Sequence, residues 1–182
     1  MLKIFETYQK LSGLSQKVGL RKGSVQDPFI ISILGGLTGT LVMDVSNMLL
    51  WLFRGTDATY GHIAATMTMA PFKTRKPKNW LIGQILHMTA GAWLGLPIFY
   101  LFKKTGTKHY VIKGILTGSL IMELVYDLSR KLNIVSFNPG LPRTHYAKLW
   151  HNLLFGMTAA QTMVTLADPN VFQTNTEDNE TS

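Results

Sequence analysis

Five ionisable side chains lie inside stretches of sequence that are otherwise largely apolar, and they are the strongest candidates for chemistry. They are Asp44, His87, Glu123, Asp127 and His151. Ionisable groups are costly inside an apolar segment and by default indicate a functional site. Helical spacing adds neutral partners, because Asn47 follows Asp44 by one turn and Gln84 precedes His87 by one turn, so that each pair shares a helix face.

Imidazole and carboxylate groups in this combination are compatible with several kinds of site. Asp44, His87, Glu123 and His151 could bind a divalent metal, although the Glu-x-x-His pairs of di-iron bundles are absent. With Asp127, the same groups could relay protons or cations in a wet cavity. They could also form a charge-compensated network that fixes helix register. A haem between the two histidines fits the adjacent carboxylates poorly. We predict no cofactor, with a divalent metal as the alternative.

Known catalytic motifs are missing from the chain. It has no P-loop, GxSxG, HExxH or dinucleotide fingerprint, and it has no cysteine. We therefore expect a non-enzymatic protein, with a metal-dependent membrane enzyme or metal carrier as the alternative. The formal net charge is +8, but no RNA-binding or helix-turn-helix pattern accompanies it, and we expect no nucleic acid partner.

The elements that must position these residues are four apolar stretches, at 28–53, 80–102, 110–128 and 147–167. The chain has 18 Lys or Arg and 10 Asp or Glu, yet the stretches contain only Asp44, Lys113, Glu123, Asp127 and Lys148 of them. About 20 apolar residues cross a bilayer core. The sequence therefore predicts an all-α integral membrane bundle of four transmembrane helices, a multi-pass protein of the cell membrane whose partner is the lipid bilayer.

Depth along these helices predicts that the ionisable groups converge. With a rise of about 1.5 Å per residue, all five lie in one layer on the side of the 54–79 connection. We expect Asp44, His87, Glu123 and His151 to face the interior, and at least one carboxylate to contact a histidine. The 54–79 connection itself is predicted to contain a short interfacial or re-entrant helix.

The remaining parts flank a membrane domain at 28–167. Residues 1–27 are predicted to form a basic amphipathic segment that binds anionic lipids. Residues 168–182 are predicted to be a disordered acidic tail.

Small residues recur at four-residue spacing in every stretch. The pairs are Gly35/Gly39, Gly91/Gly95, Gly114/Gly118 and Gly156/Ala160. Such pairs let helix backbones approach closely in lipid. They predict close helix crossings, and a homo-oligomer through the same GxxxG faces is a further possibility.

The second half of the chain resembles the YagU-type bacterial inner-membrane proteins, a family of small membrane proteins without assigned function. The resemblance lies in His87 followed by Gly91 and Gly95, in a third stretch that contains Lys-Gly-x-x-x-Gly, and in a last stretch that begins with Trp150 and His151 and continues to Gly156. It implies a four-helix protein of the bacterial cytoplasmic membrane. It implies no chemistry, and Asp44 lies outside it.

Overall fold

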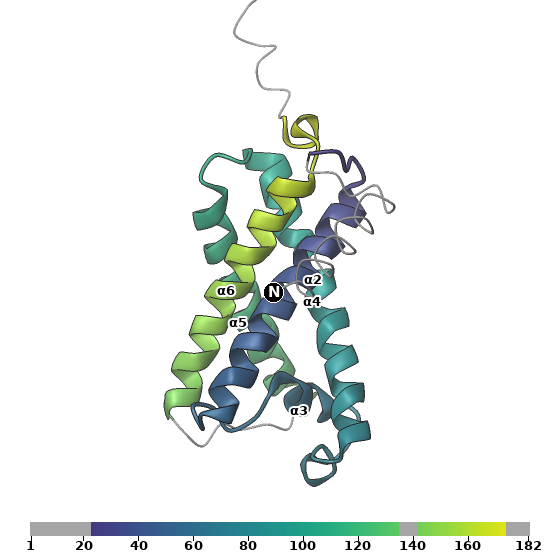
Figure 1. Ribbon diagram of the computed structural model, residues 1–182, viewed down its shortest axis with the longest axis vertical. Coiled ribbons are helices and arrows are strands. Elements are labelled where there is room, and N and C mark those ends of the chain that lie inside the picture. The colour runs from purple at the N-terminus through teal and green to yellow at the C-terminus, as the bar shows by residue number, and fades with distance from the viewer. Residues whose placement is uncertain (1–22, 135–141, 174–182) are drawn as a thin grey trace, which may run out of the picture.

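The computed structural model describes residues 23–134 and 142–173, and every named element within them is a helix (Figure 1). The long helices are α2 (Pro28–Leu52), α4 (Pro77–Thr105), α5 (Tyr110–Lys131) and α6 (Pro142–Leu166). The short helix α3 (Tyr60–Ala65) and the 3-10 turn η1 (Pro71–Lys73) lie in the connection between α2 and α4, and η2 (Pro169–Phe172) follows α6. Most of the predicted N-terminal segment (1–22) and the end of the predicted tail (174–182) lie outside the described residues.

Local sequence signals explain where the helices begin. The side chain of Asp27 accepts hydrogen bonds from the backbone N–H groups of Phe29 and Ile30, at 2.8 and 2.9 Å, and caps α2. Helices α2 and α4 both start with a proline, whose fixed φ suits the first helical position.

At the other end of α4, the Lys113 ammonium donates to the backbone oxygens of Thr105 and Gly106, each at 2.9 Å. This contact explains why a charged residue stands inside the apolar stretch at 110–128.

Two of the described helices, α2 and α4, are long and apolar enough to cross a membrane by length and composition. Helices α5 and α6 do not meet that standard. Helix α5 contains Lys113, Glu123 and Asp127 in one membrane-sized window, and α6 is rich in polar side chains. The structure therefore supports an all-helical protein with two candidate spans.

The long helices are packed in the order α4, α2, α6, α5. Helix α2 packs against both α4 and α6, and α6 packs against both α2 and α5, whereas α4 and α5 touch each other much less. Helix α3 packs against α4 at one end of the molecule (Figure 1). This arrangement leaves a groove between α4 and α5, which is described below.

Glycines stand at the helix crossings, as the small-residue pairs predict. A Cβ atom built on Gly95 would lie 2.0 Å from the carbonyl oxygen of Ser32 in α2. A Cβ on Gly114 would lie 2.6 Å from the carbonyl oxygen of Gly156 in α6. Backbones this close leave no room for a side chain. The glycine faces of these helices therefore form contacts between helices of the same chain.

A largely apolar core fills the end of the bundle opposite α3. Its completely buried members include Ile98, Phe99, Phe102 and Phe155. Phe172 of η2 joins them, with its ring centroid 5.2 Å from that of Phe99. Ordered structure thus continues past residue 168, where the tail was expected to begin, because Phe172 finds an aromatic pocket that the polar composition around it does not reveal.

Candidate functional site

The centre of the site is a contact between α2 and α4. Atom Nε2 of His87 lies 3.1 Å from Oδ1 of Asp44, within ion-pair distance but without the geometry of a hydrogen bond. The other carboxylate oxygen of Asp44 accepts a hydrogen bond from the side-chain amide of Gln84. Both partners are largely buried, with side chains 14% and 15% exposed. The expected contact between a carboxylate and a histidine is confirmed.

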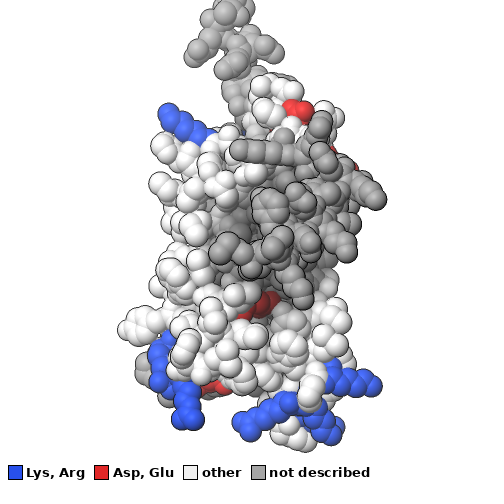
Figure 2. All heavy atoms as spheres, viewed as in Figure 1, with Lys and Arg blue, Asp and Glu red and all other residues white. Residues whose placement is uncertain are grey.

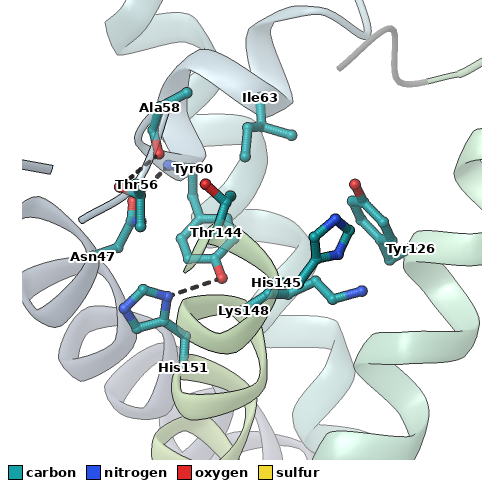
Figure 3. Close-up of a pocket in the computed structure, with 10 residues that line it drawn as sticks. All are labelled: Asn47, Thr56, Ala58, Tyr60, Ile63, Tyr126, Thr144, His145, Lys148 and His151. Atoms are coloured by element: carbon teal, nitrogen blue, oxygen red, sulfur yellow. Dashed lines mark hydrogen bonds between the residues drawn. The ribbon is translucent and has the colours of Figure 1, made fainter. Parts of the chain in front are cut away.

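Tyr60, the first residue of α3, joins the two histidines. Its ring stacks on His87, with centroids 4.8 Å apart and planes 10° from parallel. Its hydroxyl lies 3.2 Å from Nδ1 of His151 in α6 (Figure 3). Its backbone N–H donates to the side-chain oxygen of Asn47 at 3.0 Å. The predicted residues Asp44, His87, His151, Asn47 and Gln84 therefore belong to one cluster, which Tyr60 completes.

The phenol of Tyr60 stays neutral in the folded protein. Burial raises the pKa of its phenol above the ordinary range, and the nearby charge of Asp44 raises it further. The phenol therefore keeps its proton, and it can donate to Nδ1 of His151 or accept from it, according to the tautomer of the imidazole. The second ring nitrogen of His151 is buried and makes no hydrogen bond of standard geometry in the described structure, although the ring interacts with the backbone of Ser46.

The two acidic residues of α5 do not join this cluster. Glu123 binds Lys148 of α6 instead, with 2.7 Å between Oε1 and Nζ, and its side chain is 47% exposed. Asp127 is exposed on the same helix. The convergence predicted for the whole layer thus fails for Glu123 and Asp127. The physical reason is that α5 packs on α6 through Gly114 and Gly118, and the groove separates it from α4.

No preformed metal site appears in the described part of the chain. No three His, Asp or Glu side chains come together there as a metal would require. The predicted set of Asp44, His87, Glu123 and His151 would need Glu123 to leave Lys148 and cross the groove. The geometry therefore gives the metal alternative no support.

A small cavity borders the cluster on the α3 side. Its volume is about 30 Å³, enough for a water molecule. Figure 3 shows Tyr60 and His151 meeting at this cavity, with Lys148 and Tyr126 on its far side. The polar cluster thus has space for a water molecule on its α3 side, whereas apolar side chains fill most of the other end.

The sequence did not predict Tyr60 as a member of the cluster, because it lies outside the four apolar stretches. Its position could have indicated a role, since it begins a short apolar segment in a connection that must fold back onto the bundle. Comparisons of the chain with known protein families, characterised proteins and solved structures find no match. The resemblance to YagU-type proteins therefore stays a prediction.

Proposed function

We propose that this chain is a non-enzymatic, multi-pass membrane protein in which the polar cluster acts as a clasp. The clasp holds α3 on the bundle and fixes the register of α2, α4 and α6. One observation carries this proposal: Tyr60 contacts His87 through its ring face and His151 through its hydroxyl, while Asp44 holds His87 from α2. Each side chain comes from a different element, so the contacts cannot form unless all four elements are in place.

The surface of the bundle supports a membrane location with four spans. Helix α5 exposes large apolar side chains at four-residue intervals: Ile112, Leu116, Leu120, Leu124 and Leu128, followed by Leu132 just after the helix. On the face shown in Figure 2, Lys and Arg gather mainly at the end where α3 lies, and the described surface above them is largely uncharged. A soluble protein rarely exposes so large an apolar surface. The location in a bacterial cytoplasmic membrane rests on the YagU resemblance alone.

The shape of the cluster favours a clasp over a proton channel. A channel needs polar groups or water along the whole depth of the bundle. Here the half opposite α3 is filled by Phe99, Phe102, Phe155 and their apolar neighbours. Protons that enter from the α3 side would meet a closed core.

A proton or cation relay is the second candidate function. It is favoured by the Nε2 atoms of His87 and His151, which are buried without hydrogen bonds of standard geometry. His151 borders the water-sized cavity, and His87 lines the groove between α4 and α5. Groups of this kind can take up protons when water enters. The relay would require the aromatic half to open.

A double-mutant cycle tests the clasp. Asp44→Asn and His87→Asn each remove one member of the pair, and the free energy of unfolding is measured in detergent. We expect the double variant to lose less stability than the sum of the single losses, with a coupling of about 0.5–3 kcal/mol. Glu123→Gln combined with His87→Asn is the control and should be additive, because Glu123 binds Lys148. Additive losses for the first pair would refute the clasp.

Proton flux separates the two candidates. Wild-type protein is reconstituted into vesicles containing a pH-sensitive dye, and a pH step is applied. The clasp predicts the same leak as in empty vesicles. A proton flux that depends on His87 and His151 would refute the clasp as the function and support the relay.

A further inference from the structure

The groove between α4 and α5 is a second cavity with a different character. Its volume is about 180 Å³. Most of its lining is apolar and comes from α3 and the turn after it, from α4 and from α5. The side chains of Met67, Leu94, Met122 and Val125 are among them. Met67 and Val125 are 49% and 41% exposed, so the groove is open along its side.

Polar side chains line the half of this groove nearer α3, and they are Tyr60, His87, Tyr126, Ser129, Lys148 and Asn152. Tyr126 and Ser129 stand near the end of α5, and Lys148 near the start of α6, which is the α3 side of the molecule. Deeper positions are Leu94 and Met122, and Leu94 lies about 10 Å beyond His87 along α4. The groove thus changes from polar to apolar with depth.

The polar end carries a positive charge. Among the described residues that line the groove, Lys148 is the only Lys, Arg, Asp or Glu. Its ammonium lies 4.2 Å from the centre of the Tyr126 ring and is paired with Glu123, which is not part of the lining. Lys148 is therefore the positive charge that an anion in the groove would contact, in competition with Glu123.

The size and lining of the groove restrict what can fill it. An α-helix with its side chains is about 10–12 Å wide and does not fit such a volume. A single unbranched hydrocarbon chain is the apolar shape that a narrow groove can hold. Flexible methionine side chains such as Met43, Met67 and Met122 adapt to such a chain.

We propose that this groove binds one single-chain amphiphile with an anionic head, of the fatty carboxylate class. The carboxylate contacts Lys148 at the α3 end, and the hydrocarbon chain lies between α4 and α5. This site borders the clasp, since Tyr60 and His87 also line the groove, but Lys148 and the apolar lining take no part in the contact between Asp44 and His87.

Native mass spectrometry of the protein in an uncharged detergent tests the groove, with laurate as the probe. We expect saturable binding of one laurate per chain. Ala90→Phe places a ring in the groove and should weaken binding at least about tenfold. Leu120→Phe is the matched control, since Leu120 is exposed on α5 outside the lining, and it should bind as the wild type does. If Ala90→Phe does not fold, Met67→Trp replaces it as the blocking variant.

Head-group variants test the role of Lys148. Lys148→Gln should weaken laurate binding about tenfold, as expected for the loss of one charge-assisted contact, and leave dodecanol binding unchanged. Glu123→Gln should strengthen laurate binding, because it frees Lys148 from its partner.

Three results would overturn the proposal. The first is laurate binding that is unchanged in the blocking variants, and the second is laurate binding that is unchanged in Lys148→Gln. The third is dodecanol binding as tight as that of laurate in the wild type. An anionic two-chain phospholipid is the remaining source of such a head. If it binds with the same dependence on Ala90 and Lys148 and laurate does not, the assignment to fatty carboxylates is wrong.

Discussion

The contacts of His62 link the start of α3 to an ionisable side chain. The Trp80 indole donates to the hydroxyl of Thr59 at 2.9 Å, and that hydroxyl lies 2.8 Å from Nδ1 of His62. Trp80 occupies one acceptor position of the Thr59 hydroxyl, and that hydroxyl can donate its own proton to an unprotonated Nδ1 of His62. Burial lowers the pKa of His62, and the charge of Arg75 lowers it further.

We expect acid to weaken the docking of α3 through His62. The folded protein binds the His62 proton less well than the unfolded chain does, and the ordinary pKa is 6.5. Stability is therefore fully present above that pH and is lost as the pH falls below it towards the lower folded pKa. Chemical unfolding followed between about pH 8 and about pH 5 should show this decline.

His62→Gln isolates this contribution from those of the other histidines. The free energy of unfolding of the variant should decline less with acid than that of the wild type. The difference in slope should correspond to less than one bound proton, since His62 is only partly buried. A decline identical to that of the wild type would show that His62 does not couple to folding.

At the scale of residues, the sequence predicted the members of the cluster better than their partners. Asp44, His87 and His151 could be found because an ionisable group in an apolar helix must be compensated. The placement of Glu123 could not, since it depends on how α5 is rotated on α6 and on the reach of the Lys148 side chain. Depth along a helix follows from counting residues, whereas direction around the helix axis follows only from packing.

The crossing of α2 and α4 shows that neighbouring glycines need not be equivalent. A Cβ on Gly91 would lie 1.8 Å from the side-chain oxygen of Thr40, whereas a Cβ on Gly95 would meet the backbone oxygen of Ser32. A side chain can be removed by mutation or can rotate, but backbone can give way only if the helices separate.

We therefore expect Gly95→Ala to cost more than Gly91→Ala in thermal unfolding. Overpacking of this kind costs about 1–3 kcal/mol, with Gly95→Ala at or above the upper end. Adding Thr40→Ala should recover part of the loss in Gly91→Ala and none of the loss in Gly95→Ala. If Thr40→Ala rescues both variants equally, the crossing is not controlled by these local contacts.

Element boundaries followed from the sequence where apolar residues mark them. The stretch at 28–53 corresponds to α2 (Pro28–Leu52), and the start of α5 at Tyr110 was also predicted. Helix α6 begins at Pro142 rather than at 147, and α4 at Pro77 rather than at 80. The additional first turns are polar, so hydropathy does not detect them, whereas a proline in the first helical position indicates them.

The whole molecule raises the question of whether α5 and α6 cross the membrane with α2 and α4. Their polar residues have local explanations: Lys113 binds the end of α4, Glu123 pairs with Lys148, and His151 joins the cluster. Charges that are paired or lie near helix ends cost far less in lipid than isolated charges. A hydropathy window counts these residues as if each were isolated, so it cannot decide.

Single cysteines in this cysteine-free chain can decide the number of spans. Lys76→Cys, Lys108→Cys and Lys131→Cys each place a thiol at an exposed position beside a helix end. With four spans, positions 76 and 131 should react with a membrane-impermeant maleimide from the same side, and position 108 only from the opposite side. Leu120→Cys is the control: exposed in the middle of α5, it should resist the reagent if lipid covers it. Labelling of positions 108 and 131 from one side, or ready labelling of position 120, would show that α5 does not span.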